Sequence, residues 1–162
     1  MSGGSPPAGE EDLLRAVAER AAARAVLGSA LAGFLAGLLA LAFLWLSGSR
    51  VDATTVPVVV LLAIGQLAGV VAAGSAALRL RELRSGMPVR ETAERAQRGL
   101  RTLARVTGVV GALTAVAMPV LLEPRATASF TAIAGLGVLA QVVVVLTVVR
   151  RPLSRVARAA HR

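Results

Sequence analysis

The chain has 162 residues, of which 56% are hydrophobic and only 2% aromatic, and its formal net charge is +9. Cysteine is absent, which excludes disulfides and thiolate metal sites. A basic chain of this size can bind nucleic acid, but its arginines lie between and after long apolar runs without aromatic neighbours. This distribution is typical of membrane proteins, so we do not expect nucleic acid as a partner.

The chain begins with a segment of small residues, glycine and proline at positions 1–9, which we expect to be disordered. Acidic residues open the next segment, where the helix macrodipole favours them, and residues 10–24 predict an amphipathic helix. Its apolar stripe recurs at helical spacing and comprises Leu14, Ala18, Ala21 and Ala25.

Four long apolar runs without charge follow, and each predicts a transmembrane helix. A helix needs about 17–25 such residues to cross the hydrocarbon core. The third run is the shortest, but Arg101 and Arg105 can extend it by reaching toward lipid headgroups. The runs do not alternate in polarity, which excludes barrel strands. We therefore expect an all-α integral membrane protein with spans at about 25–47, 56–78, 106–122 and 126–149.

The arginines are distributed unequally among the segments that connect these spans. The N-terminal, central and C-terminal segments hold 16 of the 18, and the two short connections hold Arg50 and Arg125. By the positive-inside rule, both termini and the central segment lie in the cytoplasm. Every basic residue other than His161 is arginine, a bias typical of GC-rich bacterial genomes, so we expect a multi-pass protein of a bacterial plasma membrane.

The arginines next to the spans have two interpretations, topology alone or binding of anionic lipid headgroups. The second interpretation predicts headgroup contacts for Arg79, Arg81, Arg84, Arg90, Arg95, Arg98, Arg101, Arg105, Arg150 and Arg151. The central segment also contains an amphipathic stripe, at Val89, Ala93, Ala96 and Leu100. We expect both stripes to lie on the membrane surface; the alternative is a partner helix docked as a coiled coil.

The two halves of the chain resemble each other at a spacing of 75 residues. The spacing superposes the Ala-Glu-Arg-Ala run at 18–21 on the run at 93–96, and Gln66 on Gln141. We therefore expect two repeated units, residues 10–84 and 85–162, each an amphipathic helix followed by a transmembrane hairpin. Both units start in the cytoplasm, as in parallel repeats.

Two kinds of residue inside the spans suggest helix packing. Gln66 and Gln141 can bridge helices through their amides, which we favour, or they can line a permeation site. Small residues allow close approach of helix backbones, and we assign this role to Ser29, Gly33, Gly37, Gly65, Gly69, Gly108 and Ala112.

No span contains an ionisable residue, although proton-coupled transporters, pumps and intramembrane hydrolases normally need one at depth. No serine or threonine of the spans has an acid or histidine nearby in sequence to act as a base, and the chain has no phosphate-binding pattern of a glycine-rich loop followed by lysine. We therefore predict no catalytic, cofactor-binding or metal-ligating residues. The expected function is a non-enzymatic membrane scaffold or accessory subunit that binds anionic lipids and a membrane protein partner or a second copy. The alternative is a small transporter or channel for a neutral or apolar solute.

Overall fold

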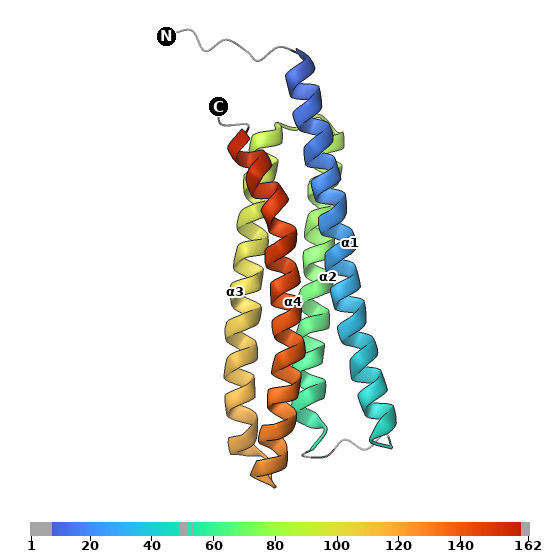
Figure 1. Ribbon diagram of the computed structural model, residues 1–162, viewed down its shortest axis with the longest axis vertical. Helices are drawn as coiled ribbons and strands as arrows, with labels where there is room; N and C mark the ends of the chain where they lie inside the picture. The colour runs from blue at the N-terminus through green and yellow to red at the C-terminus, as the bar shows by residue number, and fades with distance from the viewer. Residues whose placement is uncertain (1–7, 49–51, 53, 160–162) are drawn as a thin grey trace.

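The structure, a computed structural model, describes residues 8–48, 52 and 54–159, and this part of the chain forms four long helices. They are α1 (Ala8–Leu46), α2 (Val56–Arg84), α3 (Val89–Leu121) and α4 (Arg125–Ala159). Successive helices run antiparallel, so the α2–α3 turn lies at the same end as the start of α1 and the end of α4 (Figure 1). The predicted all-α architecture with four long apolar helices is confirmed.

Helix α1 begins two residues earlier than predicted, because Ala8 and Gly9 belong to it; residues 1–7 of the segment expected to be disordered lie outside the described residues. The predicted amphipathic helices and the spans that follow them are continuous, as α1 and α3. The 39 residues of α1 extend over about 58 Å, and the 29 residues of α2 over about 43 Å. Both exceed a hydrocarbon core of about 30 Å. The surplus length lies mainly at the end that carries most arginines, which we call the arginine-rich end.

The turn between α2 and α3 spans residues 85–88, where a glycine followed by a proline predicts a break. Gly86 adopts a φ of +88°, a left-handed conformation that glycine reaches without strain. The Met87 N–H donates to the Glu82 carbonyl at 3.2 Å, and the Gly86 N–H donates to the Leu83 carbonyl at 3.2 Å. These bonds satisfy carbonyls at the end of α2, and Pro88 then starts α3 with its fixed φ.

The connection between α1 and α2 is held at its end by Asp52. Its Oδ1 accepts hydrogen bonds from the Thr54 hydroxyl at 2.6 Å, the Thr54 N–H at 2.9 Å and the Thr55 N–H at 3.1 Å. Because these bonds favour the carboxylate, they lower the pKa of Asp52 from its ordinary value. The bonds fix the backbone just before α2; Arg50 lies outside the described residues.

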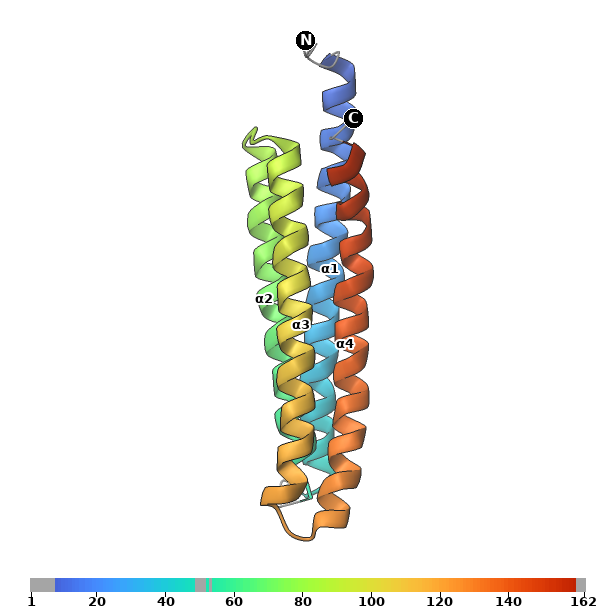
Figure 2. The same cartoon turned by 90° about the vertical axis from the view of Figure 1, so that its left-hand side faces the viewer.

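Helix α1 packs mainly along α2, and α3 packs mainly along α4. Helices α2 and α4 also contact each other across the centre, whereas α1 and α3 barely touch (Figures 1 and 2). The core consists mostly of small side chains, which let the helices approach closely. Its buried members include Ala25, Ala32, Ala36, Ala68, Ala72, Ala76, Leu100, Val142 and Leu146.

The closest approach of α1 and α2 is at Gly33 and Gly69. A Cβ atom added to Gly69 would lie 2.5 Å from the Gly33 backbone nitrogen and 2.9 Å from the Ser29 carbonyl oxygen. Real Cβ atoms essentially never come within 3.0 Å of another heavy atom. Only glycine therefore fits at this crossing, and the two backbones are in direct contact.

The prediction that both amphipathic stripes lie on the membrane surface is wrong. Ala18 is 0% exposed and Ala93 is 2% exposed, and both belong to an apolar cluster at the arginine-rich end. The other buried members of this cluster are Ala22, Leu83 and Val156. Because α1 and α3 continue straight into the bundle, their stripes cannot turn toward a membrane surface. The helices of the same chain cover them instead.

Buried positions recur in the two hairpins, at two different spacings. Helices α1 and α3 bury residues 75 apart: Ala18, Ala21 and Ala25, and then Ala93, Ala96 and Leu100. Helices α2 and α4 bury residues 74 apart: Leu61, Gly65, Ala68 and Ala72, and then Gly135, Leu139, Val142 and Leu146. At a spacing of 74, Gln66 corresponds to Ala140 and not to Gln141. An internal duplication stays a prediction, and the burial pattern gives the two glutamines different positions in their hairpins.

The outer surface of the bundle between its two ends is apolar. Large exposed side chains occur on every helix, among them Phe34 at 61%, Leu67 at 66%, Leu113 at 66% and Ile133 at 70% exposure. We call this band of exposed apolar side chains the apolar belt. Soluble monomers rarely expose patches larger than a few hundred Å². The molecule therefore has an apolar middle and charged ends.

Candidate functional site

The arginines predicted to contact headgroups fall into two groups. Four of them form ion pairs with glutamates of their own helix: Arg79 with Glu82 at 2.5 Å, Arg90 with Glu94 at 3.2 Å, Arg95 with Glu91 at 3.0 Å, and Arg98 with Glu94 at 3.5 Å. Exposed pairs of this kind contribute only about 0–1 kcal/mol to stability. The remaining six form no ion pair with a described carboxylate: Arg81, Arg84, Arg101, Arg105, Arg150 and Arg151.

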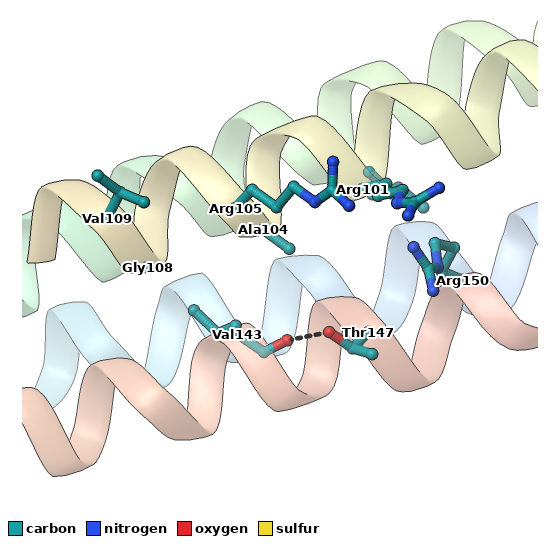
Figure 3. A pocket seen from close by; sticks show the side chains of 9 residues that line it. Arg101, Ala104, Arg105, Gly108, Val109, Val143, Thr147 and Arg150 are labelled. Carbon is teal, nitrogen blue, oxygen red and sulfur yellow. Dashed lines mark hydrogen bonds between the residues drawn. The ribbon is translucent and has the colours of Figure 1, made fainter. Parts of the chain in front are cut away.

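Three of these unpaired arginines line a groove of about 510 Å³ between α3 and α4, which we call the arginine groove. Arg101 and Arg105 come from α3 and Arg150 from α4, and their side chains gather at one end of the groove (Figure 3). The other lining residues are Leu100, Ala104, Gly108, Val109, Val143 and Thr147. The groove is therefore cationic at the arginine-rich end and apolar toward the middle of the bundle.

The local sequence explains how the groove is built. Arg101 and Arg105 are one helical turn apart and so share a face of α3. Thr147 turns its hydroxyl back to the Val143 carbonyl at 2.8 Å, so its polar atom is satisfied within α4 (Figure 3). Gly108 keeps the apolar half open, because a Cβ atom added there would meet no atom within 4 Å.

The charge of the groove is uncompensated by the residues that the structure describes. Arginine stays protonated, and no described carboxylate pairs with any of the three guanidinium groups. The Nε atom of Arg150 is also buried and has no hydrogen-bond partner in the described chain. Charges beside apolar walls interact more strongly than charges in bulk water. An anion in the groove would therefore offset mutual repulsion and use the free donors.

The two glutamines both lie on the outside of the bundle. Gln66 is exposed but rests against α1, because a Cβ atom added to Gly37 would lie 2.8 Å from its Nε2 atom. Gln141 is exposed on α4. Neither residue lines the arginine groove. The structure thus brings Gln66 to a helix contact and leaves Gln141 on the outer surface.

Replacing either glutamine with leucine is expected to change the free energy of unfolding by at most about 1–2 kcal/mol. Neither amide has a hydrogen bond to another helix among the described residues, and leucine is favoured in lipid. Thermal unfolding of Gln66→Leu and Gln141→Leu in detergent would measure the effect. A larger loss at Gln141 would contradict its position on the outer surface, because its outward amide has no hydrogen-bond partner to lose among the described residues.

Five of the small residues assigned to helix packing are buried: Ser29, Gly33, Gly37, Gly65 and Gly69. Ala112 is exposed, and Gly108 lines the groove between α3 and α4 without a close helix contact, because no atom lies within 4 Å of its added Cβ. Gly111 makes the close contact of α3, where an added Cβ atom would clash with the end of the Leu139 side chain. The helical spacing of Ala93, Ala96 and Leu100 continues at Thr107 and Gly111, which are seven and eleven residues after Leu100. This periodicity in the sequence could have identified the buried face of α3.

The fold defines the class of protein. The described chain is all-helical, and its four helices are long and apolar enough to cross a membrane. No protein-family model, curated protein or solved structure matches the chain. Among the described residues, no three acidic, histidine or cysteine side chains are grouped as a metal site requires.

Proposed function

We propose that the chain is a four-pass integral membrane protein that acts as a non-enzymatic scaffold or accessory subunit, with an arginine-rich cytoplasmic side that binds anionic lipid. The apolar belt is the observation that supports this function. Each large apolar side chain left in water forgoes about 1.5–3 kcal/mol of burial free energy. Lipid around the belt removes that cost, and the charged ends then lie at the two membrane surfaces.

The alternative function is a small transporter or channel for a neutral or apolar solute. Its path would run between helices, near Gln66 and Gln141. The crossing of Gly33 and Gly69 favours the scaffold, because direct backbone contact leaves no room for a solute between α1 and α2. The outward position of Gln141 favours it too, since a solute between the helices would not meet this side chain.

A scaffold or accessory subunit should also have a protein partner in the membrane, either a different protein or a second copy of the chain. Purification from native membrane in mild detergent, with the mass of the complex measured, would identify it. A chain that purifies only as a lipid-bound monomer and supports solute uptake in vesicles would favour the transporter instead.

The proposed topology can be tested with single cysteines, because the chain has none of its own. Ser85 in the α2–α3 turn and Glu123 before α4 are both exposed. In intact cells, an impermeant maleimide should label Glu123→Cys and spare Ser85→Cys, since the positive-inside rule places the arginine-rich end in the cytoplasm. Permeabilised cells should label both variants and serve as the control. Labelling of Ser85→Cys in intact cells would refute the orientation.

A further inference from the structure

We infer that the arginine groove is a site for one anionic glycerophospholipid, with its phosphate held by Arg101, Arg105 and Arg150 and one acyl chain in the apolar half. The inference rests on the proposed function, because a lipid reaches the groove only if the apolar belt lies in a bilayer. It also selects three arginines among the ten that the sequence assigns to headgroups.

The charge of the groove identifies the ligand as an anion. Arg79, Arg90, Arg95 and Arg98 already have glutamate partners, whereas the three groove arginines have none among the described residues. Guanidinium groups bind phosphate through paired, charge-assisted hydrogen bonds. Arg150 lies in the groove (Figure 3), and its buried Nε atom has no hydrogen-bond partner among the described residues.

The depth of the groove identifies the anion as a lipid headgroup. Arg105 is the last charged residue of α3 before its uncharged run, and Arg150 is the first after the uncharged run of α4. Because the two helices are antiparallel, these residues lie at one level, where the apolar belt ends. Arginines at this boundary meet the phosphates of the cytoplasmic leaflet.

The apolar half of the groove distinguishes a phospholipid from a free phosphate. From Arg101 to Val109 the groove follows α3 for about 12 Å, and its deeper part is lined by Gly108, Val109 and Val143. A soluble anion would use only the cationic end. An acyl chain would also occupy the space that Gly108 leaves open, because no atom lies within 4 Å of its added Cβ.

The test uses the full chain in nanodiscs that contain phosphatidylglycerol as the anionic probe and phosphatidylcholine as the neutral one. Native mass spectrometry should find one retained phosphatidylglycerol per chain. Arg101→Gln and Arg150→Gln should each weaken its retention about fivefold or more. Gly108→Leu should weaken it similarly without a change of charge, by filling the apolar half. Arg81→Gln removes the same charge from an exposed site outside the groove and should change retention less than twofold.

Three outcomes would overturn the site. Equal weakening by Arg81→Gln and Arg150→Gln would show that the arginines act as a diffuse charged surface, which leaves the proposed function intact. Competition by soluble glycerol phosphate as strong as that of phosphatidylglycerol, with no effect of Gly108→Leu, would reduce the groove to a phosphate site. If the chain retained phosphatidylglycerol no better than phosphatidylcholine, the result would contradict both the groove site and the binding of anionic lipid in the proposed function.

The folding of each variant is checked by measuring its helicity and its thermal unfolding, with variant and wild-type chain in one detergent. Arg101 is exposed and Gly108 has open space beside it, so substitutions there should leave the bundle intact. These two variants decide the inference even if Arg150→Gln fails to fold. The cysteine-labelling experiment tests the membrane topology separately, so its failure is distinguishable from failure of the groove.

Discussion

Replacing Gly69 with alanine should destabilise the bundle by about 1–3 kcal/mol or more, as overpacking does in a close-packed interior. The added methyl group would meet the backbone of Gly33 and the carbonyl oxygen of Ser29. Backbone atoms cannot rotate away as a side chain can, so α1 and α2 would have to separate along the crossing. Unfolding in detergent, followed by helicity, would measure the loss.

Gly74 provides the matched control, since it lies on the same helix, is exposed, and would have no atom within 4 Å of an added Cβ. Gly74→Ala should be neutral or stabilise the chain by up to about 1 kcal/mol, because alanine is the better helix former. Gly111→Ala should have an intermediate effect, because it meets the end of the flexible Leu139 side chain. Equal effects at Gly69 and Gly74 would contradict the crossing.

Replacing Leu83 with alanine should destabilise the arginine-rich end by about 2–5 kcal/mol, the usual cost of a cavity in a core. Leu83 is 1% exposed and is the largest aliphatic side chain of the apolar cluster that includes Ala18 and Ala93. The other members are mostly alanines, which cannot move to fill the space. Hydrogen exchange should therefore accelerate around Ala18 and Ala22 in α1 and around Ala93 in α3.

The control for Leu83 is Leu78, a leucine on the same helix that is 63% exposed. Leu78→Ala should change the free energy of unfolding by about 0.5 kcal/mol or less. Exchange around Ala18 and Ala93 should stay at the wild-type rate. Two results would contradict the packing of α1 and α3 around Leu83. One is an equal loss in the free energy of unfolding for Leu78→Ala and Leu83→Ala, and the other is unchanged hydrogen exchange in Leu83→Ala.

The sequence by itself determined the number of long apolar helices and most of their ends. The apolar run that starts at residue 56 begins where α2 begins, and the glycine and proline at 86 and 88 separate α2 from α3. These features depend on neighbouring residues alone. Charge, length and turn-forming residues act locally, so they can be recognised without knowing what each helix contacts.

Only the tertiary structure decided what covers each apolar face and which small residues make the close contacts between helices. Alanine, glycine and valine are frequent throughout these helices, so composition does not distinguish Gly108, which borders the open groove, from Gly111, which contacts Leu139. The amphipathic stripes are buried, but helices of the same chain cover them and not the membrane surface that we predicted. Periodicity identifies an apolar face and does not show what covers it. The arginine groove likewise needed α3 and α4 side by side, since Arg105 and Arg150 are far apart in the chain. Rotation about a helix axis and the choice of neighbour are set by the fit of side chains between helices, which depends on residues that are distant in sequence.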